Sequence, residues 1–146
     1  MRISSKGCYA IAALTEMALD EKQSRIAVAT IAQRLNISKI YLEQVFSILK
    51  RGGLIASTKG AQGGYTLSQS PDQITIYNIL APIELMLFES SEQSLENIPP
   101  EAALIMDKLI FKQLDEAVTK TLKSVTLADL AAELKNKRGD SSMYYI

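Results

Sequence analysis

Apolar residues recur at helical spacing along the first 53 residues, which predicts three consecutive helices. In the segment 4–19, Tyr9, Ala13 and Met17 recur every four residues, which is typical of a helix with one buried side. A shorter helix is predicted over 28–35, where Ile31 and Leu35 are one turn apart. The third helix, over 39–53, has a complete apolar stripe made of Leu42, Val45, Phe46 and Leu49. A tight turn at 36–38 separates the last two helices.

The third helix is polar on its other side and has recognisable ends. Its outer positions at the same spacing are Ile40, Glu43, Gln44 and Ser47. Ser38 is placed to cap the helix N-terminus, and Gly52 and Gly53 follow its C-terminus. Two helices joined by a short turn, the second with a polar outer face, predict a helix-turn-helix.

A β-hairpin is predicted directly after this motif. The segments 54–58 and 65–68 are rich in β-forming residues and are separated by a glycine-rich stretch with Lys59 at its start. The stretch "GAQGG" lacks the GK[ST] sequence and the following helix of a phosphate-binding loop. A hairpin in this position is a wing.

The second half of the chain predicts an extended helical arrangement. A fourth helix over 71–87 is disturbed at Pro82, and an acidic linker follows over 89–100. A helix over 101–124 would be about 36 Å long, more than a small domain needs. Its apolar stripe requires a partner, most simply a second copy of the chain. The residues expected at this dimer contact are Met106, Ile110, Leu114 and Ala117.

A last helix over 127–137 is expected, capped by Thr126, and "RGDSS" is interpreted as a flexible spacer before the apolar ending "MYYI". The predicted fold is therefore mainly α with a small β wing. Its parts are a winged helix-turn-helix domain (1–88), a linker (89–100), dimerisation helices (101–137) and a C-terminal tail (138–146).

Charge is distributed unevenly along the 146 residues. Residues 1–70 carry nine Lys or Arg against four Asp or Glu, whereas 71–146 carry seven against twelve. A basic N-terminal half suits contact with a polyanion, although solvated faces would give the same counts. There is one cysteine and no histidine, which removes the usual general base and most metal sites, so an enzyme is not expected. No signal-peptide core or membrane-spanning apolar stretch is present, which predicts a cytoplasmic protein without a membrane partner.

Three stretches, "RISSKGCYAIAAL", "IAQRLNISKIYLEQVFSILKRGGLIASTKGAQGGYTL" and "TLADL", resemble the Rrf2 family of bacterial transcription regulators. The resemblance covers essentially the whole chain and is most specific at "YLEQ" with "ILKRGGL" and at "KGAQGGY". It implies a winged helix-turn-helix homodimer that binds palindromic operator DNA.

Many members of that family hold an iron–sulfur cluster on three closely spaced cysteines after the fourth helix. This chain has "ESSEQSLENIPPE" there, without cysteine or histidine, so thiolate ligation of a cluster within one chain is impossible. The resemblance therefore points to the cluster-free branch, whose best-known type represses cysteine metabolism, and no cofactor is expected. A cluster-free regulator of another stress or metabolic response is the alternative.

The candidate DNA contacts lie on the third helix, the wing and the N-terminus. Gln suits adenine and Glu can accept from cytosine, which makes Gln44 and Glu43 candidates for base contacts. Tyr41 could bond a phosphate or pack in the core, and the resemblance favours phosphate. Lys59 stands where the family usually has arginine at the wing tip, and it can still neutralise a phosphate. The remaining expected contacts, each of which could instead be solvated, are Arg2, Lys6, Ser38, Lys50 and Arg51.

Two further features remain open at this stage. Cys8 is interpreted as a small buried residue, with a redox switch as the less favoured alternative. The ending "MYYI" resembles the C-terminal peptides that dock into cysteine synthase (O-acetylserine sulfhydrylase). Tyr144, Tyr145 and Ile146 are therefore candidates for docking to that enzyme through a terminal carboxylate. The alternative is that the tail packs on the dimer surface.

Overall fold

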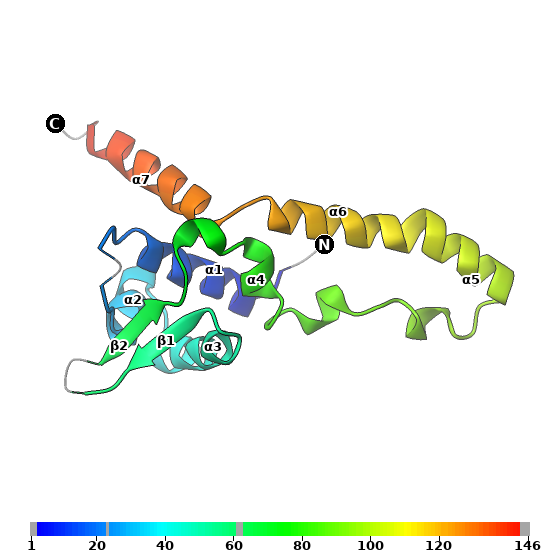
Figure 1. Cartoon of the computed structure of the whole chain (residues 1–146), viewed down its shortest axis with the longest axis horizontal. Coiled ribbons are helices and arrows are strands. Elements are labelled where there is room, and N and C mark those ends of the chain that lie inside the picture. The colour runs from blue at the N-terminus through cyan, green and yellow to red at the C-terminus, as the bar shows by residue number, and fades with distance from the viewer. Residues whose placement is uncertain (1–2, 23, 61–62, 144–146) are drawn as a thin grey trace.

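The computed structural model describes residues 3–22, 24–60 and 63–143 and consists of a body and a projecting arm (Figure 1). The body begins with three helices, α1 (Ser5–Ala18), α2 (Val28–Leu35) and α3 (Lys39–Arg51). A hairpin of β1 (Ile55–Thr58) and β2 (Gly64–Leu67) follows, and then come the 3-10 turn η1 (Pro71–Gln73) and the short helix α4 (Ile76–Leu80). The predicted mainly helical fold with a small antiparallel β wing is confirmed.

The core of the body is made of aliphatic side chains from all of these helices and one phenylalanine. The predicted stripe of α3 is buried completely, because Leu42, Val45, Phe46 and Leu49 all have 0% exposure. Other fully buried side chains come from α1, α2, α4 and the last helix, and include Leu14, Ile31, Ile79 and Leu127. Periodicity alone therefore identified the buried face of α3 correctly.

The fourth helix is much shorter than predicted. The segment 71–87 was expected to be one helix disturbed at Pro82, but only Ile76–Leu80 is α-helical. Thr75 and Asn78 form a capping box at its start, which prevents the helix from extending back into η1. Beyond Pro82 the chain continues through a second 3-10 turn, η2 (Leu85–Phe88), because proline cannot donate the next helical hydrogen bond.

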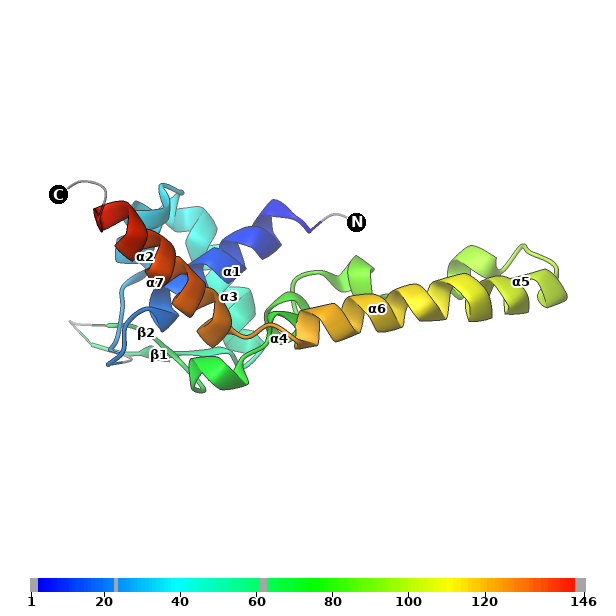
Figure 2. The same cartoon turned by 90° about the horizontal axis from the view of Figure 1, so that it is seen from above.

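The arm is one long helix with a π-helical insertion. It consists of α5 (Pro100–Met106), the π segment η4 (Asp107–Phe111) and α6 (Lys112–Lys123). The connector that leads to it contains η2 and η3 (Gln93–Leu95) and runs outward from the body, and the long helix returns alongside it in Figures 1 and 2. The predicted long helix is confirmed, but its π segment was not predicted.

The last helix, α7 (Leu127–Met143), belongs to the body rather than to the arm. It was expected to end near residue 137 and to be followed by a flexible spacer, but it continues through residues 138–142 as helix. It packs on α1, with Leu127 in the core, and its expected part in dimerisation stays a prediction. Thr126 caps it as predicted, since its Oγ1 accepts from the amide of Asp129 at 3.2 Å. Tyr144, Tyr145 and Ile146 lie outside the described residues.

Within the part of the chain that the structure describes, no helix is long and apolar enough to cross a membrane.

Candidate nucleic-acid interface

Helix α3 presents a polar face on the outside of the body. Glu43, Gln44, Ser47, Lys50 and Arg51 are all exposed, and Ile40 is 70% exposed on the same helix. Ser38 Oγ accepts from the Tyr41 amide at 3.3 Å, so this candidate DNA contact acts first as the N-cap of α3. The cap fixes the end of the helix that recognition helices usually direct at base edges.

Lys39, which the sequence analysis did not select, is exposed in the first turn of α3. Its Nζ lies 3.8 Å from Glu43 Oε1, one turn further along, and both side chains are exposed. This ion pair between neighbours contributes little to stability. It does lower the net negative charge next to Gln44, which favours the approach of a phosphate backbone. The signal for Lys39 was its position directly after the Ser38 cap.

Tyr41 is half-buried and packs edge-to-face against Tyr9 of α1, with ring centroids 5.6 Å apart. Tyr41 was expected either to contact a phosphate or to pack in the core, and the structure shows that it packs against the body. The contact also brings the first two turns of α1, which include Lys6, beside the start of α3. Arg2 lies outside the described residues.

Lys50 and Arg51 occupy the opposite end of the same helix. They are in its last turn, about 15 Å along the axis from Tyr41 at 1.5 Å per residue. Two cations there also compensate the negative end of the helix dipole. The structure thus separates the candidate contacts on α3 into an N-terminal group, with Tyr41, Glu43 and Gln44, and a basic C-terminal group.

The hairpin forms a wing that is anchored to α3. Phe46 of α3 and Tyr65 of β2 pack edge-to-face with centroids 5.0 Å apart. The backbone of Tyr65 also exchanges two hydrogen bonds with Ile26, of 2.9 and 3.0 Å, which adds a third chain segment to the hairpin. The pairing was not predicted, because a single residue between the polar connector 20–25 and α2 has no strand pattern of its own.

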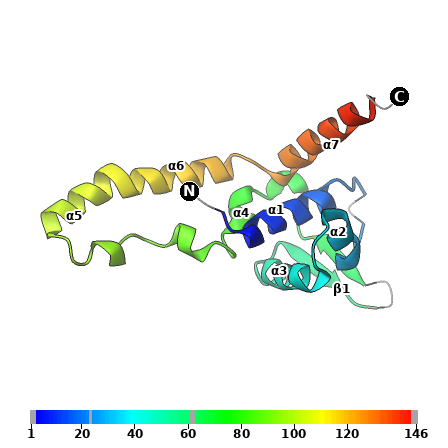
Figure 3. The ribbon, with the colours of Figure 1, turned by 180° about the vertical axis from the view of Figure 1, so that it is seen from behind.

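Lys59 follows the last residue of β1 and is exposed. The turn beyond it contains Gly60 at φ 120°, a conformation that L side chains rarely adopt. Thr58 Oγ1 donates to the Gly64 carbonyl at 3.0 Å and closes the base of the loop. Lys59 therefore directly follows the hydrogen-bonded base of the hairpin. Figure 3 shows that hairpin and α3 on one side of the body, with α7 on the opposite side.

The arm has an apolar surface that no described part of the chain covers. Among the candidate dimer contacts, Ile110 is 46% and Leu114 is 55% exposed, Ala117 is exposed, and Met106 is half-buried. The structure adds three more exposed side chains that the sequence analysis missed, namely Leu104, Ile105 and Leu109. Leu109 lies within η4, whose i→i+5 bonding shifts the stripe after Met106 by one residue relative to a regular helix. Leu104 and Ile105 precede this segment, in α5.

Cys8 was interpreted as buried, but it is exposed on α1. The buried side of the first two turns is instead formed by Gly7 and Ala10. Spacing along α1 could not distinguish these neighbouring small residues.

This chain belongs to the Rrf2 family of iron-dependent transcriptional regulators, to which residues 3–133 match. It is a helix-turn-helix transcription regulator. It is similar to the regulator CymR of Bacillus subtilis, with 34% identity over 146 residues that span the whole of both chains. It is also similar to the regulator IscR of Erwinia tasmaniensis, with 32% identity over 89% of this chain and 78% of that protein.

The solved structure of CymR, described as the global cysteine regulator of B. subtilis, superposes with a TM-score of 0.75 at 34% identity. The match covers 91% of this chain and 98% of that one. The winged-helix body and the arm therefore have a known counterpart in an experimental structure.

The iron dependence in the family description does not fit the donors of this chain. Iron–sulfur clusters are held mainly by cysteine thiolates, with histidine as an occasional replacement. The sequence contains Cys8 alone and no histidine. Within 3–22, 24–60 and 63–143, no group of three or more His, Cys, Asp or Glu side chains could hold a metal ion. No step of DNA recognition is therefore derived through iron.

Proposed function

We propose that the protein is a dimeric repressor that reads a palindromic operator with α3 and the wing. The observation that supports it best is the exposed polar face of α3 over a fully buried apolar stripe, next to a hairpin that carries Lys59. In this proposal Gln44 and Glu43 contact base edges. Lys6, Tyr41, Lys50, Arg51 and Lys59 contact phosphates, together with Arg2 and Ser38.

Selection of binding sites from a random duplex pool, followed by titration of the recovered site, tests this proposal. Gln44→Ala should broaden the recovered sequence and weaken the best site by about 1–3 kcal/mol. Lys59→Ala should weaken all sequences alike and reduce the slope of log affinity against log salt by about 0.9 for each half-site, about 1.8 for the dimer. Lys137→Ala, an exposed lysine on α7, is the matched control and should leave the slope unchanged. Recovery of no preferred sequence would contradict the proposal.

The dimer is proposed from the uncovered surface of the arm. Five large aliphatic side chains, between 46% and 70% exposed, follow one another along α5, η4 and α6. Soluble monomers seldom leave so continuous an apolar surface in water. Two copies of the arm packed together would cover it and would hold two copies of α3 for the two half-sites of a palindrome. Sedimentation of the full chain over a range of concentrations should show a dimer that dissociates to monomers only on dilution.

Regulation of cysteine or sulfur metabolism is proposed from the similarity to CymR over the whole length. In the same proposal the tail docks into cysteine synthase, with the Ile146 carboxylate in place of the carboxylate of an amino-acid substrate. Helix α7 carries the chain as far as Met143 on the side of the body opposite α3 (Figure 3). An enzyme held there would leave the DNA-binding face open.

Purified cysteine synthase should bind the full chain, and O-acetylserine should compete. Deleting Ile146 should abolish binding, and adding one glycine after Ile146, which displaces the carboxylate, should do the same. Ile146→Val is the control, because it keeps both the carboxylate and a branched side chain. Equal binding by all of these variants would favour the alternative, a cluster-free regulator of another response whose tail is structural.

A further inference from the structure

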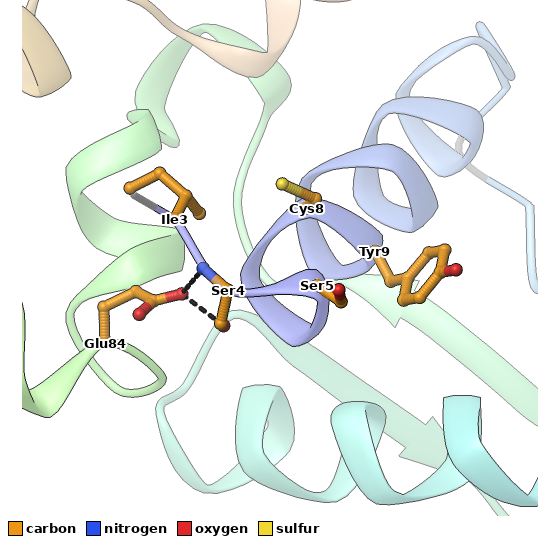
Figure 4. Close-up of a pocket in the computed structure, with 6 residues that line it drawn as sticks. All are labelled: Ile3, Ser4, Ser5, Cys8, Tyr9 and Glu84. Atoms are coloured by element: carbon orange, nitrogen blue, oxygen red, sulfur yellow. Dashed lines mark hydrogen bonds between the residues drawn. The ribbon is translucent and has the colours of Figure 1, made fainter. Parts of the chain in front are cut away.

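Glu84 joins the root of the arm to the first turn of α1. It lies between α4 and η2, where its backbone amide donates to the Leu80 carbonyl at 2.7 Å. Leu80 is 1% exposed, so the backbone of Glu84 is fixed by the core. Figure 4 shows the side chain reaching across to Ser4 at the start of α1.

The Glu84 carboxylate accepts two hydrogen bonds from Ser4. Its Oε1 lies 2.9 Å from the backbone nitrogen of Ser4 and 2.5 Å from its hydroxyl (Figure 4). The same hydroxyl accepts from the Gly7 amide at 3.1 Å and so caps α1. A carboxylate at a helix N-terminus is also favoured by the helix dipole. A hydrogen-bonded chain thus runs from Glu84 through Ser4 to Gly7, the third residue of α1.

Gly7 makes this close approach possible. A Cβ atom built at Gly7 would collide with Glu84 Oε1, and it would lie 2.9 Å from Ile3 Cγ2 and 3.1 Å from Leu80 Cδ2. A side chain at this position would therefore displace the Glu84 carboxylate from Ser4. The contacts of Glu84, Ser4 and Gly7 are called the clasp below.

The clasp fixes the part of α1 that borders the DNA-binding face. Lys6 lies in the turn that Ser4 caps, and Tyr9 in the next turn packs on Tyr41 at the start of α3. Rotation or fraying of this turn would move Lys6 relative to α3. A carboxylate close to a phosphate contact opposes DNA electrostatically, so any benefit of Glu84 to binding must come from geometry.

We propose that Glu84 is a positioning residue for DNA binding, which holds the first turn of α1 so that Lys6 meets a phosphate of the operator. The inference rests on the proposed DNA interface. It predicts different operator affinities for Glu84→Ala and Glu84→Gln, although both substitutions remove the same negative charge. Glu84→Ala loses the acceptor for Ser4 and should weaken operator binding about fivefold. Glu84→Gln keeps a carbonyl acceptor and should bind as tightly as the wild type, or more tightly.

A double-mutant cycle on operator affinity, measured with full-length folded proteins, separates positioning from mere stabilisation. Lys6→Ala should weaken the wild type about fivefold but weaken Glu84→Ala less than about twofold, because Lys6 is already misplaced there. Glu89→Ala, which removes an exposed carboxylate from the connector, is the control for charge, and in that background Lys6→Ala should keep its full effect. Gly7→Ala should behave like Glu84→Ala.

Three results would overturn the inference. They are tighter binding by both Glu84 variants, an equal effect of Lys6→Ala in the wild-type and Glu84→Ala backgrounds, and no effect of Lys6→Ala in the wild type. If the wild type itself recovers no preferred operator sequence, the DNA interface is wrong as a whole. If Gln44→Ala alters specificity while the cycle is additive, only the role of Glu84 fails.

Discussion

The body and the arm bury their apolar side chains in different ways. The body encloses Phe46, Leu42, Leu127 and their neighbours at 0% exposure. Among the described residues of the arm none is fully buried, and Leu104, the most exposed of its large aliphatic side chains, reaches 70%. Because burial of apolar surface is the main source of stability, the body has its own source of stability, whereas the arm has little within the described chain. In the proposed dimer, the arm would bury its apolar side chains against a second copy.

The largest expected effect is on the body. Leu127→Ala empties a fully buried site at the start of α7, where the Leu127 amide donates to the Ile74 carbonyl, and it should lower the free energy of unfolding by about 2–5 kcal/mol. Because the site lies within one chain, the loss should be independent of protein concentration. Denaturant unfolding at two concentrations about tenfold apart measures this. Leu114→Ala in the arm is the matched control and should give a loss that depends on concentration.

The second prediction concerns the arm. Ile110→Asp with Leu114→Asp would place charges in the proposed dimer contact, so the protein should become monomeric while the body keeps its unfolding transition. Loss of the second half-site contact should weaken operator binding on the order of 100-fold. Sedimentation and DNA titration provide the two measurements.

Lys108→Asp with Lys112→Asp puts two carboxylates on polar positions of the same helix. This control pair should remain dimeric, although it also breaks the exposed 3.4 Å ion pair between Lys112 and Asp107. A dimer that persists in the Ile110 and Leu114 variant would show that the arm's exposed surface has another use.

The same contrast explains how far the sequence could predict the molecule. The stripe of α3 and its Ser38 cap depend on residues within two turns of each other, and both were predicted correctly. The π segment was missed because an i→i+5 bond needs no special residue type, and one extra residue then changes which side chains share a face. The spacing of apolar residues therefore predicts the buried face of a helix only where the helix is regular.

Contacts between distant segments account for the other errors. Ser4 and Glu84 are 80 residues apart, and α7 reaches α1 through Arg138 and Glu16, 122 residues apart. Nothing in the sequence near residue 138 indicates that "RGDSS" has a partner, so it was interpreted as a spacer. The candidate DNA residues of α3 could be predicted from the spacing of residues along one helix. The clasp could not, because it joins segments that only the complete fold brings together.

The third prediction concerns the contact between α7 and α1, which includes an ion pair. Arg138 donates from Nη2 to Oε1 of Glu16 at 2.6 Å, and Arg34 of α2 lies 4.0 Å from the other carboxylate oxygen. The Glu16 side chain is only 5% exposed, and the hydrogen bond that Arg138 donates to it raises the pKa of Arg138. Arg138→Ala would leave the buried Glu16 carboxylate poorly paired and should lower the free energy of unfolding by about 1–2 kcal/mol. This is less than the loss expected for a fully buried ion pair, because the Arg138 side chain is 57% exposed to solvent.

Lys137→Ala removes the neighbouring exposed cation and should change the free energy of unfolding by less than about 0.5 kcal/mol. Hydrogen exchange should show faster exchange along the second half of α7 in Arg138→Ala and unchanged exchange in α3. If both helices lose protection together, α7 is an inseparable part of the body.

The smallest expected effect is the pH dependence of a second ion pair between α7 and the body, Glu21 with Lys135. Glu21 Oε1 and Lys135 Nζ are 2.8 Å apart and both side chains are exposed. The hydrogen bond and charge of Lys135 lower the pKa of Glu21, and Glu21 raises the pKa of Lys135 in return. A carboxylate with a lowered pKa stabilises the folded state fully above its unfolded pKa, about 4.3, and the contribution is lost as the pH falls through the folded value. Lys135 contributes below its unfolded pKa, about 10.4, and loses that contribution only as the pH rises through its raised folded value.

The pair should therefore be fully formed between roughly pH 5 and pH 9. Glu21→Gln should lower stability slightly in that window, and the difference from the wild type should vanish as the pH falls towards 3. Glu133→Gln, which neutralises an exposed carboxylate on α7, is the control for general charge effects. Thermal unfolding of the three proteins at each pH gives the difference curves. A Glu21→Gln difference as large at pH 3 as at pH 6 would mean that the side chain acts through packing, since a protonated Glu21 no longer attracts Lys135.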